Sequence, residues 1–469
     1  MNEDIKPIKV EETSYQKLVK PYYEEAVKTL GEVIAIPSVH DESSKSEKMP
    51  FGKEVENALS YMAKKGQELG FKVDRCDNYV TELSYGEGDQ TFDIYAHMDV
   101  VPVKKENWVH EPFKMTIDND IIYGRGSSDD KGPGIACLYA VKALMDNNRL
   151  GGYKLRFLFG GNEERDSLCL EHYFHKLNKG YPTIGFSPDA DYPLIYGEKS
   201  IYSYKATYDV DLKEVKSFSL GDALNIVLAE ADCELVADER VLKELLATYK
   251  EKHPEVKISY QDGHLKFIGV PYHGSMPYNG VNAGLHMLNF LGHLYNIKRL
   301  RDIYDDYHDG RGEGFKGNFN DQYFDCSTYN VGKITFDNKH VTIYVNCRFP
   351  AGLKVSDIIK NITLNTGSEV ELLGGSEGFV ADPKSPFVTK LLASYQEETG
   401  DYASKPLAIG GGTYSRESKN TVAFGAQFPG RDYKMHGDDE FFPVSDFYAN
   451  MQIYAHAIDV LSEYLRKGE

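Results

Sequence analysis

Side chains that could bind metal ions or transfer protons recur at the ends of predicted strands and before a predicted helix. They are His97, Asp99, Asp129, Asp130, Glu163, Glu164 and Asp189. Each pair alone has an ordinary explanation. His97 and Asp99 could make surface or core hydrogen bonds, and Asp129 and Asp130 could cap the helix that follows them. Glu163 and Glu164 could lie on a solvated face. If the side chains converge, however, their mutual repulsion is prohibitive without cations. The set therefore indicates a metal site.

The segments around these residues predict a sheet that would bring them together. The runs 92–96, 154–159 and 183–186 are short and apolar, as in strands, and apolar residues recur at helical spacing over 135–145, after Pro133. Strand, helix and strand in this order predict a mostly parallel α/β sheet. Ligands bind such sheets at the carboxyl ends of the strands, where the polar residues follow.

The pattern changes near residue 200. The runs 200–211 and 341–347 alternate like antiparallel strands, and the segment 302–318, rich in Asp, Gly and Tyr, predicts a surface loop. After about residue 385 the α/β pattern returns, with helices predicted at 387–395 and 447–464.

Two domains follow from this change of pattern. Residues 1–199 and 384–469 predict an α/β domain with a mixed, mostly parallel sheet and flanking helices. Residues 200–383 predict an inserted α+β lid domain. Within it, the stretches 203–272 and 328–374 each follow a strand–helix–strand order, which suggests an internal duplication.

The composition argues against several classes of function. The 469 residues include 53 Lys and Arg against 72 Asp and Glu, a net charge of −19, which opposes binding to nucleic acids and anionic membranes. No apolar run approaches the ~20 residues that span a bilayer, and the N-terminus lacks the apolar core of a secretory signal. The six cysteines are scattered and form no CxxC pair, which indicates reduced thiols rather than a disulfide framework. We expect a cytoplasmic protein.

Ten motifs, in order along most of the chain, resemble those of the M20 metallopeptidases and, within that family, the PepV-like bacterial dipeptidases. They are 96–102, 124–133, 161–164, 186–193, 221–225, 273–277, 280–283, 348–350, 410–416 and 436–440. The resemblance implies the fold described above and a metal-dependent dipeptidase that acts on short unblocked peptides, as a monomer.

The resemblance also implies two divalent metal ions. One is bound by His97, Asp129 and Asp189, and the other by Asp129, Glu164 and His436, so that Asp129 bridges them. Asp130 is the alternative to Asp129, and relatives have a cis peptide bond between these two positions. Imidazole and carboxylate ligands suit Zn²⁺ and also accept Mn²⁺ or Co²⁺.

Further roles carry over from the same motifs. Glu163 is expected to be the general base for a metal-activated water, Asp99 to orient His97, and His273 to donate a hydrogen bond to the oxyanion. The residues expected to hold the C-terminal carboxylate of the substrate are Asn225, Arg348, Gly412 and Thr413. For Arg348, which follows a predicted strand, a simple surface salt bridge is the competing explanation.

Two other functions compete with the dipeptidase. An acyl-amino-acid amidohydrolase of the aminoacylase or desuccinylase type is disfavoured by Asp189, where acyl-cleaving relatives tend to carry Glu. A non-catalytic peptide-binding protein would be expected to lack a ligand or the base, and none is missing. Ten of the eleven histidines outside the motifs are expected to be surface or packing residues: His110, His172, His175, His253, His264, His286, His293, His308, His340 and His456.

Overall fold

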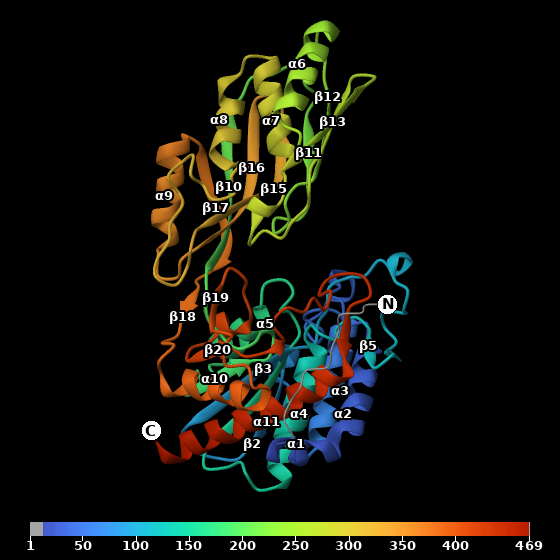
Figure 1. Ribbon diagram of the computed structural model, residues 1–469, viewed down its shortest axis with the longest axis vertical. Coiled ribbons are helices and arrows are strands. Elements are labelled where there is room, and N and C mark those ends of the chain that lie inside the picture. Colours follow the sequence, from blue (N-terminus) through green and yellow to red (C-terminus); the bar gives the residue numbers. More distant parts are fainter. Residues whose placement is uncertain (1–12, 469) are drawn as a thin grey trace. The chain divides into compact units, whose positions relative to one another are not determined.

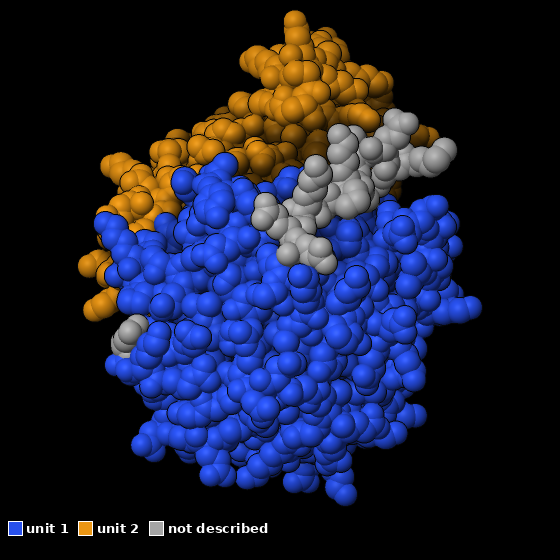
Figure 2. All heavy atoms as spheres, turned by 60° about the horizontal axis from the view of Figure 1, so that its bottom comes forward, with its two compact units in different colours: residues 1–196, 381–407, 413–469 blue, residues 197–380, 408–412 orange. Residues whose placement is uncertain are grey.

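The computed structural model describes residues 13–468 and divides into two compact units (Figure 2). The first unit comprises the described parts of residues 1–196, 381–407 and 413–469, and the second comprises residues 197–380 and 408–412. The chain thus leaves the first unit after Tyr196 and returns to it after Val380. Both of these boundaries lie three residues before the predicted ones, at 199/200 and 383/384.

A mixed sheet forms the framework of the first unit (Figure 1). Its strand order is β1-β2-β6-β3-β7-β20-β9-β18, with β19 beside β9. The central strands β6, β3, β7 and β20 are parallel, and the strands that continue the sheet on either side are antiparallel. The bounds are β1 Lys72–Asp74, β2 Val80–Tyr85, β3 Thr91–His97, β6 Lys154–Gly160, β7 Ile184–Ser187, β9 Ile195–Glu198, β18 Phe379–Val380, β19 Leu407–Ile409 and β20 Thr421–Ala423.

Helices pack on this sheet and on one another. The helix α4 contacts β3, α2 and α11, and α3 contacts β2. Almost every residue of α4 is buried, which makes it the central helix of the unit. The bounds are α1 Ser14–Val19, α2 Tyr23–Ile34, α3 Lys53–Glu68, α4 Lys131–Asp146, α5 Leu168–Glu171, α10 Pro386–Thr399 and α11 Val444–Lys467. The helices predicted at 135–145, 387–395 and 447–464 are confirmed.

Short strands complete the first unit. One small sheet has the order β22-β5-β4, and β21 pairs with β8 in parallel. Their bounds are β4 Thr116–Asp118, β5 Ile121–Tyr123, β8 Ala190–Asp191, β21 Ala426–Gln427 and β22 Phe441–Pro443. Among the helices within residues 13–468, none combines the length and apolarity needed to cross a membrane.

The second unit is α+β and contains two antiparallel sheets. The five-stranded sheet has the order β11-β15-β16-β10-β17 and the three-stranded sheet the order β12-β14-β13. The strands are β10 Ser200–Asp209, β11 Phe218–Leu220, β12 Glu230–Glu234, β13 Lys257–Gln261, β14 His264–Ile268, β15 Thr328–Phe336, β16 His340–Phe349 and β17 Glu369–Ser376. The helices are α6 Glu239–Lys252, α7 Ala283–Leu294, α8 Lys298–Tyr307 and α9 Val355–Thr366.

One apolar core joins both sheets to the helices of the second unit. Leu242 of α6, Phe267 of β14, Met287 of α7 and Ile343 of β16 all belong to it. The strand β10 lies in the first of the two stretches suggested to be duplicates, and it pairs with β16 and β17 of the second. The two stretches therefore share one sheet.

The predicted loop over 302–318 is wrong for its first part, because α8 continues to Tyr307. Leu300, Ile303, Tyr304 and Tyr307 are buried, at the spacing of one helical face. The Asp residues between them lie on the other side of the helix and gave the segment its loop-like composition. The rest of the segment, after His308, contains no helix or strand.

The parallel pair β3 and β6 generates a stability prediction. Asp93 and Arg156 are register partners, both buried, and Arg156 Nε and Nη2 each donate to an Asp93 carboxylate oxygen at 2.6 Å. Asp93→Ala would leave the guanidinium buried without its counter-charge and should lower the free energy of unfolding by ~3–5 kcal/mol, measured by chemical denaturation. Glu68→Ala removes ion pairs of a carboxylate that is 49% exposed, and this variant should unfold like the parent. Equal transitions for Asp93→Ala and the parent would contradict this account.

Candidate metal centre

Parallel strands bring the predicted ligands of the first unit to one edge of the sheet. The strands β3, β6 and β7 lie side by side, with His97 level with Gly160 of β6. His97 ends β3, and the carboxylates follow within a few residues of the strand ends: Asp99 after β3, Glu163 and Glu164 after β6, and Asp189 after β7. The geometry of parallel strands therefore brings together side chains that the sequence places after separate strands.

Asp129 stands between the two histidines. Its Oδ1 lies 3.1 Å from His97 Nε2, and its Oδ2 lies 2.9 Å from His436 Nε2. Asp189 Oδ2 lies 3.6 Å from the same His97 nitrogen, and Glu164 Oε2 lies 3.0 Å from the same His436 nitrogen. Two groups of three candidate ligands therefore share Asp129, and within each group the ligand atoms lie within 4.8 Å of one another.

The spacing of these atoms fits metal coordination. Two ligand atoms bound to one tetrahedral ion at ~2.0–2.2 Å lie about 3.3–3.6 Å apart. The 3.6 Å between His97 and Asp189 agrees with this value, and the other three distances, 2.9 to 3.1 Å, are hydrogen-bond distances that would lengthen slightly around an ion. Imidazole nitrogen and carboxylate oxygen are donors that Zn²⁺ and related divalent ions accept.

The electrostatics of the cluster point the same way. Burial and the neighbouring Asp129 carboxylate raise the pKa of Asp189 to about 7. Desolvation opposes the charged form of His436, whose side chain is still 57% exposed, but the hydrogen bonds with Asp129 and Glu164 outweigh this effect and raise its pKa to about 11. The cluster therefore concentrates negative charge strongly enough to hold protons on its members. Divalent cations would balance the same charge.

Asp99 positions three members of the cluster at once. Its carboxylate accepts hydrogen bonds from the backbone N–H groups of Glu163 and Glu164, both at 3.1 Å. Its backbone carbonyl lies 2.9 Å from His97 Nδ1, and its carboxylate lies 3.6 Å from that nitrogen. A carbonyl can only accept, so His97 Nδ1 donates to it, and Nε2 is the ring nitrogen that is left to face Asp129 and Asp189.

The adjacent aspartates have different surroundings. The peptide bond between Asp129 and Asp130 is cis, as expected from relatives. Asp129 faces the histidine nitrogens, whereas Asp130 Oδ2 accepts a hydrogen bond from the backbone N–H of His97 at 3.1 Å. Burial, together with the nearby Asp189 carboxylate, raises the pKa of Asp130 well above its usual range.

Glu440 is a supporting residue to which the sequence analysis gave no role. Its buried carboxylate accepts hydrogen bonds from the N–H groups of Gly126, Ser128 and Asp129, at 3.0, 2.8 and 3.2 Å, and pairs with Arg125 Nη1 at 2.7 Å. It thus ties the segment that carries His436 to the loop that carries Asp129. The signal in the sequence was an acidic residue four positions after His436.

The other predicted site residues fall in both units. Asn225, His273, Arg348 and Gly412 belong to the second unit, and Thr413 to the first. Asn225 O accepts from Gly274 N at 2.6 Å, and a β-bridge joins Ile226 to His273, so Asn225 and His273 lie close together. Thr413 Oγ1 accepts from the N–H of Ser415 at 3.1 Å.

His273 is exposed, and its tautomer follows from Ser275. The Ser275 backbone N–H points to His273 Nδ1 at 3.4 Å, and Ser275 Oγ lies 2.7 Å from the same atom. Since a backbone N–H can only donate, Nδ1 is the acceptor and Nε2 carries the proton. The ring can therefore donate a hydrogen bond through Nε2.

Arg348 is mostly buried. Its Nε donates to Asn346 Oδ1 at 3.1 Å and its Nη1 to Gly410 O at 2.6 Å. These bonds fix the guanidinium within the second unit and hold the segment 408–412 beside β16. Part of its role is thus structural, with a side-chain amide and a backbone carbonyl among its partners.

Comparisons with known proteins place the chain in a family. The model of peptidase family M20/M25/M40 matches residues 94–460. A Staphylococcus aureus (strain USA300) protein named "Putative dipeptidase" is 32% identical over 465 residues, which cover 95% of this chain and 98% of that protein.

Solved structures share the fold. A dipeptidase from Saccharomyces cerevisiae matches with a TM-score of 0.57 at 17% identity, over 96% of this chain and 98% of that chain. A Bacillus subtilis peptidase described as dinuclear metal binding matches with a TM-score of 0.50 at 9% identity, over 95% and 99%. With the family match over most of its length, this chain belongs to peptidase family M20/M25/M40 and is a peptide hydrolase.

Proposed function

We propose that the protein is a dipeptidase that depends on two divalent metal ions, with Zn²⁺ favoured and Mn²⁺ or Co²⁺ acceptable. The first ion is held by His97, Asp129 and Asp189, and the second by Asp129, Glu164 and His436. The observation that carries the proposal is the position of Asp129, whose two oxygens lie 3.1 and 2.9 Å from nitrogens of different histidines. The name of the Staphylococcus aureus relative and the description of the Bacillus subtilis structure support it.

Glu163 is the general base in this proposal. When bound, the two ions polarise the scissile carbonyl and lower the pKa of the attacking water. Burial and the neighbouring carboxylates raise the pKa of Glu163 well above its usual range, so its carboxyl can hold a proton between two transfers. It takes the proton from water and gives it to the leaving amine nitrogen. Asp99 fixes the start of this segment through the N–H of Glu163.

The second unit contributes recognition in the proposal. His273, with its proton on Nε2, donates to the oxygen that becomes negative in the tetrahedral state. Arg348, Asn225 and Gly412, together with Thr413 of the first unit, hold the carboxylate of the dipeptide. A free carboxylate one residue beyond the scissile bond then defines the substrate class.

The shared ligand gives a metal-binding prediction. Asp129→Ala should bind two metal equivalents fewer than the parent, because both groups of ligands lose one residue. Asp189→Ala should bind one equivalent fewer. Metal analysis after dialysis measures both values, and Asp118→Ala, on β4, serves as the control with the parental content. Retention of the parental content by Asp129→Ala would refute the bridging role.

The base gives a kinetic prediction. Glu163→Gln keeps the shape of the side chain and removes its proton acceptor, so kcat should fall by about 10²–10⁴-fold while the metal content stays parental. Glu171→Gln, at the exposed end of α5, should keep the parental kcat. If Glu163→Gln retains full activity with its metals bound, another residue is the base.

The substrate class is tested with matched peptides. Dipeptides with a free C-terminus should be cleaved well, their amides poorly and N-acyl amino acids least. Arg348→Ala should raise KM for free dipeptides about 10- to 100-fold, because it removes a charged hydrogen-bond pair worth ~1.5–3 kcal/mol. The difference in KM between free dipeptides and their amides should therefore become smaller. The control is Arg240→Ala, an exposed substitution in the same unit. Equal cleavage of free and amidated dipeptides by the parent would refute dipeptidase specificity, and preferential cleavage of N-acyl amino acids would indicate an acyl hydrolase.

A further inference from the structure

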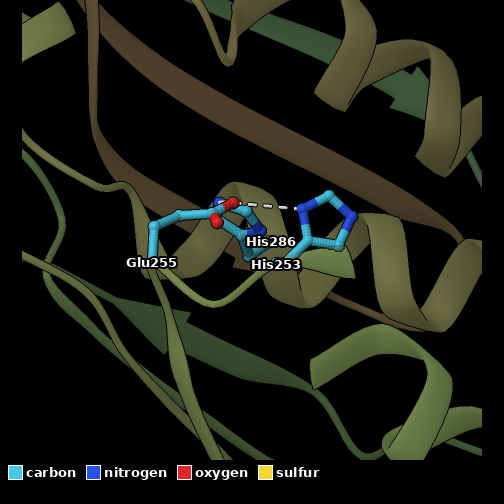
Figure 3. Close-up of side chains that lie close together, drawn as sticks. All are labelled: His253, Glu255 and His286. Carbon is cyan, nitrogen blue, oxygen red and sulfur yellow. Dashed lines mark hydrogen bonds and ion pairs between the residues drawn. The ribbon is translucent and has the colours of Figure 1, made fainter. Parts of the chain in front are cut away.

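Three side chains in the second unit form another group of candidate metal ligands. His253 follows the last residue of α6, Glu255 lies two residues later in the turn before β13, and His286 is on the buried side of α7. Their side chains point toward one another (Figure 3). His253 Nδ1 lies 3.1 Å and His286 Nε2 3.6 Å from Glu255 Oε1, and each residue has a ligand atom within 4.8 Å of the other two.

Tyr249 fixes the tautomer of His286. Its hydroxyl lies 3.2 Å from the His286 backbone oxygen and 3.2 Å from His286 Nδ1, and it accepts from Asn289 Nδ2 at 3.1 Å. The hydroxyl has one proton, and a carbonyl oxygen can only accept, so this proton goes to the backbone oxygen. The His286 Nδ1–H then donates to Tyr249, which leaves the lone pair on Nε2.

This tautomer turns a lone pair toward a carboxylate. His286 Nε2 and Glu255 Oε1, 3.6 Å apart, are both acceptors in this arrangement. A cation between the two atoms would convert a repulsive contact into an attractive one.

We propose that His253 Nδ1, a Glu255 carboxylate oxygen and His286 Nε2 bind a divalent transition-metal ion such as Zn²⁺ in the second unit. Two ligands at ~2.0–2.1 Å from a tetrahedral Zn²⁺ lie about 3.3–3.4 Å apart, between the two measured separations. Glu255 has 41% of its side chain exposed, so solvent reaches the site and a water molecule can complete the coordination.

The surroundings resemble those of a built metal site. The bond from His286 Nδ1–H to Tyr249 is the kind of outer hydrogen bond that orients a metal-binding imidazole. The rings of Tyr249 and Tyr304 pack against His253 and His286, at centroid distances of 4.3 Å for Tyr249 with His253 and 5.1 Å for Tyr304 with His286. The ion would join the turn after α6 to α7. The proposal is independent of the catalytic centre, because its ligands belong to another unit.

Zinc stoichiometry of the full chain tests the proposal. After equilibrium dialysis against Zn²⁺ near neutral pH, the parent should hold one equivalent more than Glu255→Gln, an exposed substitution that keeps the size of the side chain. Dipeptide hydrolysis by Glu255→Gln should be parental. Tyr249→Phe should weaken binding of this equivalent by about 10- to 100-fold, as loss of an outer-shell partner does. His264→Ala, an exposed histidine of the same unit, should bind Zn²⁺ like the parent.

A second readout uses the Asp129→Ala background, in which the catalytic groups are disrupted. Added Zn²⁺ should raise the thermal midpoint of Asp129→Ala and should not raise that of Asp129→Ala with Glu255→Gln. Equal zinc content in the parent, Glu255→Gln and His286→Ala would overturn the proposal and show that the three residues form only a hydrogen-bonded cluster. That result would not change the expected loss of two metal equivalents by Asp129→Ala. The proposed site in the second unit and the proposed catalytic metal site can therefore be refuted independently.

Discussion

Repulsion among the carboxylates at the end of the central parallel strands is the constraint on which the first unit depends. Asp129, Asp189, Glu163 and Glu164 meet around His97 within a fold that removes them from water, and burial raises the pKa of several of them. In the structure, imidazole protons balance part of this charge. In the proposed function two divalent ions balance this negative charge. The carboxylate repulsion that destabilises the fold without metal therefore strengthens the binding of the ions.

The supporting residues are explained by the same constraint. The carboxylate oxygens of Asp99 and Glu440 accept hydrogen bonds from backbone N–H groups. Each carboxylate thus fixes a segment that carries candidate ligands, and the partial positive charges of the N–H groups stabilise its negative charge. Arg125 compensates Glu440 at 2.7 Å. Ligands from segments far apart in sequence can therefore be held at fixed distances before any ion arrives, which lowers the cost of binding.

Local patterns in the sequence could predict the parts of the site that follow strands. His97, Glu164 and Asp189 come after apolar runs, and the geometry of parallel strands does the rest. His436 has no such signal, because it lies in a turn with a positive φ of 58° and reaches Asp129 only through the tertiary fold. The resemblance alone identified it. Glu440 was overlooked because its partners are backbone N–H groups more than three hundred residues away.

The second unit shows where composition misleads. The segment 302–307 was predicted as a loop from its Asp residues, yet Ile303, Tyr304 and Tyr307 give it a buried helical face. His253 and His286 were expected to be surface or packing residues, since nothing in the linear sequence shows that the end of α6 meets α7. Pairing between distant segments is the information that a single sequence does not contain.

The central claim is that one carboxylate, Asp129, bridges two metal ions. Anomalous diffraction from crystals of the Zn²⁺-loaded protein, measured on both sides of the zinc edge, tests it most directly. The account predicts two peaks about 3.5–4 Å apart, one beside each Asp129 oxygen. A single peak among these residues, or two peaks of which only one contacts Asp129, would contradict it.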